Sequence, residues 1–227
     1  MIEFSTSYKY LFLGCHLDDV EYGCGGLISR LINLDKNILR IHILSCKNYN
    51  SEGIIQLSRN LDEKANVVKI LGIGESQYLV SDIKGQRFCE ETQKIRELLL
   101  DDLSKFNPDM VFFPSKNDIH QDHRTLFEEA FRIFRNKCCF GYEIIRSCYH
   151  FQPNLYIELS LEHLQKKVNA VLSYESQKKE SAGYYFNEET LTTISKFRGS
   201  QSEALFAEAY EIYSFHIKDK GKDSICY

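Results

Sequence analysis

Short apolar runs alternate with longer segments of helical periodicity through most of the chain. Residues 8–15, 38–46 and 109–114 are mostly apolar, and such runs are typical of strands that are buried on both faces of a sheet. The intervening segments carry apolar residues at spacings of three and four, as amphipathic helices do. The predicted helices are one ending near Leu34 and three over 56–71, 91–106 and 120–136. Strands that alternate with helices predict a parallel sheet with right-handed crossovers.

The pattern changes after Gly141. The elements predicted there are strands over 144–151 and 155–159, a helix over 161–176, a loop over 182–199 and a helix over 203–210. No Pro/Ser-rich linker or internal repeat divides the chain. We therefore expect one α/β domain over residues 1–227, with helices on both faces of a mostly parallel, doubly wound sheet and a C-terminal elaboration.

Composition and charge exclude several classes of protein. Hydrophobic residues make up 43% of the chain and charged residues 26%, as in an ordinary folded protein. The formal net charge is −4, and the basic residues are scattered, so a nucleic-acid partner is not expected. No apolar run approaches the roughly 20 residues of a membrane span, and residues 1–16 lack the features of a secretory signal. These features predict a cytoplasmic protein without a transmembrane segment.

The eight cysteines include no CxxC pair, which excludes a zinc ribbon or a thioredoxin-type redox pair. Several of them lie within the apolar runs. We therefore expect buried free thiols with a structural role.

Two polar clusters follow predicted strands, at the edge of a parallel sheet where ligands bind. Residues 15–21 (CHLDDVE) follow the first strand, and residues 118–123 (DIHQDH) follow the strand over 109–114. The first cluster precedes Gly23, Gly25 and Gly26, but a dinucleotide-binding GxGxxG motif would need a further glycine where Ile28 stands. We interpret these glycines as allowing close packing of a helix on the sheet.

The residue types in the two clusters suit a metal ion. His16 and Asp19 are three residues apart at a strand-to-helix turn, and His123 comes from the other strand end. Two imidazoles and one carboxylate leave coordination positions open, as catalytic metal sites do. The alternative is that these histidines are helix caps or solvated loop residues.

Neighbouring side chains have roles consistent with hydrolysis. A free carboxylate at Asp18 is placed to act as general base, and His120 is a candidate to stabilise an oxyanion or protonate a leaving amine. Asp122 is expected to accept a hydrogen bond from an imidazole and fix its tautomer, or to favour a helix dipole. Asp118 and Gln121 have the spacing of a capping box, and Asp118 is interpreted as structural.

The motif HLDDVEYGCGG, together with the later IHQDH, resembles the signatures of the PIG-L/LmbE-like de-N-acetylases, HPDDxE followed by GxGG and a later HxDH. The resemblance implies a Rossmann-like, LmbE-like fold and zinc-dependent removal of an N-acetyl group from an amino sugar. It places the metal ligands at His16, Asp19 and His123 and the base at Asp18. It also implies that His120 stabilises the intermediate and that Asp122 orients His120.

Some positions differ from the family pattern. Leu17 stands where the family has proline, which affects the stiffness of the loop and no ligand. Residues 45–48 (SCKN) differ from the usual Thr/Ser-x-Gly-Glu, which bears on substrate contacts. Arg59 is a candidate for binding substrate hydroxyls or phosphate, although an arginine on a helix is often solvated or ion-paired.

The cofactor implied by the resemblance is one Zn²⁺ per chain, and Fe²⁺ or Co²⁺ would suit the same ligands. The expected partner is an N-acetylated sugar, free or linked to a lipid or nucleotide; association into a homo-oligomer stays open. Two alternatives stay open as well: a non-haem Fe(II) enzyme that uses His16, Asp19 and His123, and a non-catalytic sugar-binding module on the same fold.

Overall fold

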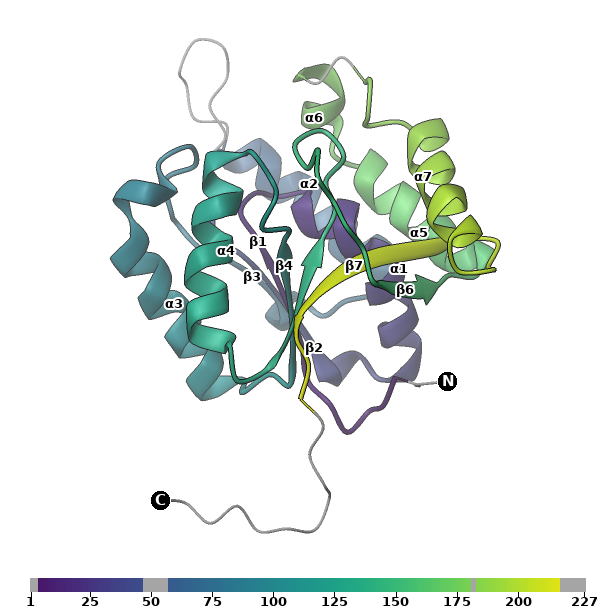
Figure 1. Ribbon diagram of the computed structural model, residues 1–227. Helices are drawn as coiled ribbons and strands as arrows, with labels where there is room; N and C mark the ends of the chain where they lie inside the picture. The colour runs from purple at the N-terminus through teal and green to yellow at the C-terminus, as the bar shows by residue number, and fades with distance from the viewer. Residues whose placement is uncertain (1–3, 47–56, 181–182, 217–227) are drawn as a thin grey trace.

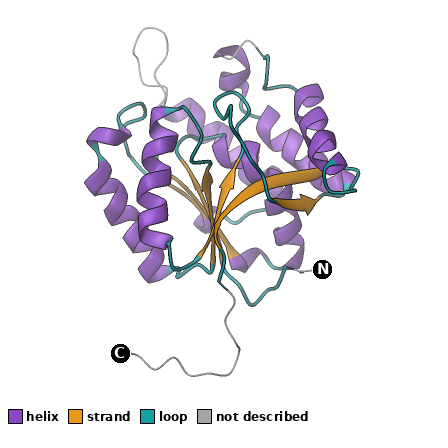
Figure 2. Ribbon diagram, in the orientation of Figure 1, coloured by secondary structure: helices purple, strands orange, loops and turns teal. Residues whose placement is uncertain are grey.

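The structure, a computed structural model, describes residues 4–46, 57–180 and 183–216, without the side chains of 57–60 and 180. The described residues contain a sheet of seven strands, in the order β3-β2-β1-β4-β5-β7-β6 (Figures 1 and 2). The strands are β1 (Tyr10–Gly14), β2 (Leu39–Ile43), β3 (Tyr78–Val80), β4 (Met110–Pro114), β5 (Cys138–Tyr142), β6 (Leu155–Glu158) and β7 (Ala207–Ser214). The α-helices are α1 (Asp19–Leu34), α2 (Leu57–Leu71), α3 (Thr92–Lys105), α4 (Gln121–Phe134), α5 (Leu161–Leu172), α6 (Glu175–Glu180) and α7 (Glu188–Ser200).

The sheet is mostly parallel, as predicted. Parallel pairs join β3, β2, β1, β4 and β5, and the antiparallel strand β7 joins β5 to β6 at the other edge. Side chains alternate along β1: Tyr10 and Phe12 belong to one buried cluster, and Leu11 and Leu13 belong to the other. Figure 1 shows α3 and α4 on one face and α1, α2 and α5 on the opposite face. Both faces of β1 are therefore covered, which explains its continuous apolar sequence.

The direction of the strand order reverses at β1. From β1 the parallel strands β2 and β3 extend to one side, and β4 and β5 extend to the other. Ligands of open parallel sheets bind beyond the carboxyl ends of the strands at such a switch point. The two polar clusters follow β1 and β4, the two strands that meet there.

The glycines of α1 allow the helix to approach the sheet closely, as the sequence predicts. A Cβ atom added at Gly23 would lie 2.3 Å from a ring carbon of Tyr142, and one at Gly26 would lie 2.4 Å from a methyl carbon of Leu159. Either distance is far shorter than a normal carbon–carbon contact. The carboxylate of Glu208 in β7 also accepts hydrogen bonds from the backbone amides of Gly26 and Leu27, at 2.8 and 2.7 Å.

The C-terminal part departs from the sequence predictions. Residues 203–210, predicted as a helix, include the start of strand β7, and the predicted loop over 182–199 includes most of α7. Residues 144–151 form no strand, and the predicted helix over 161–176 ends as α5 at Leu172. Strands β3 and β5 were not predicted. Side chains of β7 pack on opposite faces of the sheet: Tyr210 belongs to one buried cluster, and Tyr213 packs against the other. This tertiary packing overrides the helix propensity of the segment.

The cysteines within the described ranges are free thiols, and all except Cys89 are buried, as expected; Cys226 lies outside these ranges. None of the helices described is both long enough and apolar enough to cross a membrane.

Candidate metal and catalytic site

The turn between β1 and α1 folds around the carboxylate of Asp19. Its Oδ2 atom accepts hydrogen bonds from the backbone amides of Cys15 and His16, at 3.0 and 2.8 Å. Asp18 precedes the first residue of α1 and has a φ of 116°, a conformation that non-glycine residues seldom adopt. Such backbone strain is concentrated at functional sites, where the surrounding structure compensates its cost.

Two of the predicted metal ligands, His16 and His123, lie close to one carboxylate oxygen of the third, Asp19. Asp19 Oδ2 lies 3.3 Å from His123 Nε2 and 3.5 Å from His16 Nδ1. Two ligand atoms at about 2.0–2.1 Å from a tetrahedral zinc are separated by about 3.3 Å. His123 Nε2 is also buried without a hydrogen-bond partner among the described residues, although burying an unsatisfied polar atom is costly. The residues present therefore fit a divalent ion.

Among the described residues, two other sets of three ligand atoms also lie close enough together to hold a metal ion. Single ligand atoms of Cys15, Asp19 and His123 lie within 4.8 Å of one another, and so do those of His16, His120 and Asp122. The buried thiol of Cys15 is thus a geometric alternative to His16 as third ligand. Nothing in the sequence singles out Cys15, because it looks like one more apolar strand residue.

Carboxylates behind the two histidines fix their orientation. His16 Nε2 lies 3.0 Å from Asp122 Oδ2, and His123 Nδ1 lies 2.8 Å from Asp118 Oδ2. Carboxylates commonly hold metal-ligating histidines in this way, through the ring nitrogen that does not bind the metal. The resemblance implied that Asp122 orients His120, but its carboxylate faces His16.

Asp118 has the spacing of a capping box and was interpreted as structural; its carboxylate faces His123 at 2.8 Å. The residue that caps α4 is His120, and the buried Asp118 carboxylate accepts from Ser147 Oγ and the amide of His120 as well as facing His123. No motif spacing in the sequence connects Asp118 to His123. This contact depends on how the loop before α4 folds back on the helix.

The site attracts positive charge. Burial alone would lower the pKa of His16, but hydrogen bonds to Asp122 and Asp19 raise it to about 9. Burial opposes the charged form of His123 as well, and Asp19 and Asp118 raise its pKa to about 10. Burial would raise the pKa of Asp19, but His123 and His16 hold it well below its usual range. A bound cation would replace the protons that the carboxylates stabilise on the two histidines. The negative charge of these carboxylates therefore favours metal binding as well.

His120 has one ring nitrogen occupied and one available. Its Nδ1 accepts a hydrogen bond from the amide of Asp122 at 3.2 Å, and the ring stacks on His123 with centroids 4.5 Å apart. Burial and the two neighbouring histidines lower the pKa of His120 to about 4. The ring is therefore neutral near pH 7, and because Nδ1 is the acceptor, Nε2 carries the proton and can donate.

The carboxylate of Asp18 lies beside the predicted ligands without being held by them. Asp18 is 9% exposed, and charges and burial, without a hydrogen bond in the described parts of the chain, set the pKa of its carboxylate. Burial raises the pKa of Asp18 well above its usual range, and the Asp19 carboxylate adds to the rise. An unpartnered carboxylate with a raised pKa is well suited to take up a proton.

An open cavity of about 780 Å³ lies above these residues. This volume is within the range of small-molecule sites. Asp18, His120 and His123 contribute polar groups, and Ile119 and Tyr149 contribute exposed apolar surface. Arg146 also lines the cavity and stacks on Tyr185, which the sequence did not indicate. Arg59 lies in α2, but its side chain is outside the described residues, so its predicted role stays a prediction.

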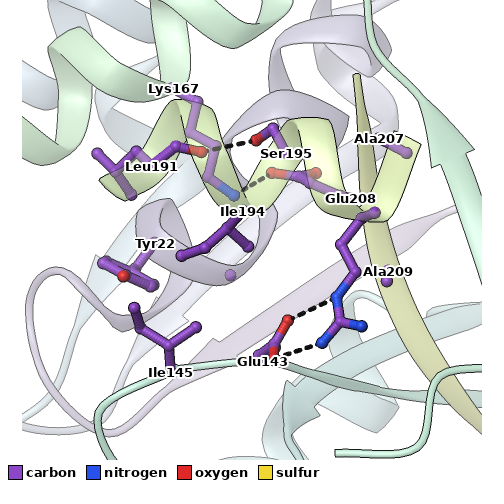
Figure 3. A pocket seen from close by; sticks show the side chains of 12 residues that line it. Tyr22, Glu143, Ile145, Lys167, Leu191, Ile194, Ser195, Ala207, Glu208 and Ala209 are labelled. Atoms are coloured by element: carbon purple, nitrogen blue, oxygen red, sulfur yellow. Dashed lines mark hydrogen bonds and ion pairs between the residues drawn. The ribbon is translucent and has the colours of Figure 1, made fainter. Parts of the chain in front are cut away.

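A second cavity, of about 20 Å³, lies beside α1, α5 and α7 (Figure 3). Charged side chains that pair with one another line it: Lys167 Nζ lies 2.7 Å from Glu208, and Arg198 donates to Glu143 at 2.6 and 3.1 Å. The cavity has room for about one water molecule and not for a sugar.

Comparisons with known proteins show which sequences and structures this chain is similar to. A family model described as "PIG-L: GlcNAc-PI de-N-acetylase" matches residues 11–134, which contain both polar clusters. The uncharacterized deacetylase YaiS of Escherichia coli (strain K12) is 24% identical over 170 residues, which cover 73% of this chain and 90% of YaiS.

Two solved structures are similar to the whole described architecture. The conserved protein TT1542 from Thermus thermophilus has a TM-score of 0.74 at 20% identity, covering 96% of this chain and 100% of that one. The N,N′-diacetylchitobiose deacetylase from Pyrococcus horikoshii has a TM-score of 0.72 at 18% identity, covering 90% of this chain and 83% of that one. The predicted Rossmann-like α/β fold is confirmed.

Proposed function

The chain belongs to the PIG-L family of GlcNAc-PI de-N-acetylases, and on that premise we propose that it is a metal-dependent hydrolase that removes an N-acetyl group from an N-acetylated amino sugar. The observation that carries the proposal is the convergence of His16, Asp19 and His123 beside the unpartnered carboxylate of Asp18. Zn²⁺ is the proposed ion, with Fe²⁺ or Co²⁺ as substitutes. The sugar is free or linked to a lipid or nucleotide.

In the proposed reaction each residue of the site has a separate role. A divalent ion at this site would polarise the amide carbonyl and lower the pKa of a water molecule. Asp18 takes the proton of the attacking water and delivers it to the leaving amine. His120 donates from Nε2 to the oxygen of the tetrahedral intermediate. Asp122 and Asp118 hold His16 and His123, and Arg59 is proposed to bind substrate hydroxyls or phosphate on sequence grounds alone.

The direct test is product release from a panel of N-acetylated amino sugars, including N-acetylglucosamine and its lipid- and nucleotide-linked derivatives. We expect acetate and a primary amine in equal amounts, loss of activity after chelation and recovery on adding Zn²⁺. A panel member that binds to the metal-loaded protein without release of acetate would support the non-catalytic sugar-binding module instead.

His120→Ala is expected to slow turnover by roughly 10²–10³-fold, since a positioned donor to an oxyanion is worth about 2.7–4 kcal/mol of barrier. The side chain also caps α4, so the variant should lose about 0.5–2 kcal/mol of stability as well. Turnover per folded, metal-loaded molecule and the melting temperature should both be measured.

Ser160→Ala is the matched control for this variant, because Ser160 caps α5 away from the cavity. It should lower stability to a similar degree and leave turnover unchanged. If His120→Ala behaves like Ser160→Ala, His120 has a structural role only.

A further inference from the structure

The side chains of Ser81, His42 and Asp102 form a hydrogen-bonded chain outside the candidate metal site. His42 lies in β2, and its Nδ1 is 2.5 Å from Asp102 Oδ2 of α3. On the other side of the ring, His42 Nε2 is 2.7 Å from Ser81 Oγ, directly after β3. The sequence positions give no hint of this arrangement, because the three residues come from separate elements and share no motif.

The partners of Asp102 determine the direction of these hydrogen bonds. Its second oxygen lies 3.3 Å from Arg40 Nη1, and the Arg40 guanidinium lies over the ring of Phe106, 4.5 Å from the centroid. A carboxylate paired with arginine is ionised and can only accept, so His42 Nδ1 is the donor. In the neutral imidazole the lone pair is then on Nε2, and the hydroxyl of Ser81 donates to it. This is the proton arrangement of a Ser-His-Asp triad.

Ser81 is more exposed than the histidine and the carboxylate behind it. The side chains of His42 and Asp102 are only 5% and 3% exposed, whereas Ser81 is partly exposed at the carboxyl edge of the sheet. The backbone amide of Ser81 donates to the carbonyl of Ile43 at 2.8 Å, which holds the serine in register with β2. A fixed hydroxyl that is hydrogen-bonded to a shielded imidazole is the arrangement that activates serine nucleophiles.

We propose that Ser81 is a second reactive centre, a serine nucleophile that accepts acyl groups from small activated carboxylic esters. Ser81 Oγ attacks the ester carbonyl carbon, the bond to the leaving oxygen breaks, and His42 moves the hydroxyl proton to that oxygen. Water then attacks the acyl carbon, its proton passes through His42 to Ser81 Oγ as the bond to that oxygen breaks, and the carboxylic acid is released. Asp102 is a positioning residue that keeps the His42 ring in the required tautomer. The reaction uses none of the groups at the metal site.

The test uses the full chain and diisopropyl fluorophosphate, with the adduct located by peptide mapping. Attack by Ser81 on phosphorus breaks the P–F bond, fluoride leaves and His42 accepts the proton. We expect one adduct per chain, on Ser81, and time-dependent acylation of the same residue by p-nitrophenyl acetate. Ser104, an exposed serine that donates to the carbonyl of Asp101, should stay unmodified and serves as the internal control.

Three variants separate reactivity from structure. Ser81→Ala should lose the adduct and keep acetate release from N-acetyl sugars, so failure here and failure of the proposed deacetylase are distinguishable. His42→Gln should abolish labelling. Asp102→Asn should slow it by up to about 10⁴-fold, the cost of the same change in a catalytic triad. Asp102→Asn should also remove the downfield His42 Nδ1 proton resonance in NMR spectra.

Absence of a Ser81 adduct in folded wild-type protein would overturn the proposal. So would labelling of Ser81 at the wild-type rate in Asp102→Asn or His42→Gln. In either case the three residues serve only to tie β2, β3 and α3 together.

Discussion

His123→Ala is expected to remove most of the bound divalent metal and to abolish hydrolysis with it. His123 Nε2 is the buried nitrogen that has no other partner in the described structure, and it lies 3.3 Å from Asp19 Oδ2. Loss of a partner behind a ligand already costs about 10–100-fold in metal affinity, and loss of the ligand itself should cost more. Metal content should be measured by elemental analysis after dialysis against limiting zinc, together with circular dichroism to verify folding.

Cys15→Ala and His16→Ala decide which residue is the third ligand. We expect His16→Ala to lose metal as His123→Ala does, and Cys15→Ala to retain it, because His16 is held towards Asp19 by Asp122. The opposite pattern would assign the ion to the Cys15, Asp19 and His123 group. Wild-type occupancy in His123→Ala would reject both groups that contain His123 and leave the group of His16, His120 and Asp122.

The fold was predictable where the hydrophobic pattern and the burial agree. β1 and β4 are continuous apolar runs because helices cover both faces, and β2 is buried as well although it contains Arg40 and His42. The sheet edge that contains β5, β6 and β7 does not show this agreement between hydrophobic pattern and burial. β7 mixes polar and apolar residues, and its Glu208 is buried against the amides of α1 and Lys167. A buried glutamate looks like a solvated helix residue until its partners are known.

The hydrophobic pattern also failed to predict two short strands, β3 and β5. β3 has only three residues, too few to establish a period of two. β5 begins soon after the end of α4, so its apolar residues look like a continuation of that helix. Their pairing with β2 and β4 fixes them as strands. Contacts between distant parts of the chain decided what local sequence left undetermined.

The proximity of the candidate ligands could be predicted from the sequence, whereas the hydrogen bonds around them could not. Strand ends at a switch point converge in any doubly wound sheet, so His16, Asp19 and His123 come together as their placement in the sequence predicts. Which carboxylate meets which ring nitrogen depends on loop conformation over distances of a few ångströms. Asp122 therefore holds His16 and not His120, and Asp118 holds His123.

Asp18→Asn is expected to lower turnover by roughly 10²-fold or more and to leave metal content unchanged, since general bases contribute on that scale. Asparagine keeps the size of the side chain and, like aspartate, tolerates positive φ, so the backbone conformation at 116° should be retained. Tyr22 N donates to the backbone carbonyl of Asp18, which the change keeps, and no hydrogen bond in the described parts of the chain involves the carboxylate that is replaced. Asp62→Asn, on the exposed face of α2, is the control and should have wild-type turnover.

The combination to look for is a folded, metal-loaded Asp18→Asn protein that still binds the N-acetyl sugar and releases acetate slowly. If it releases acetate at nearly the wild-type rate, another group takes the proton, and the raised pKa of Asp18 reflects burial and the charge of Asp19 without a catalytic role.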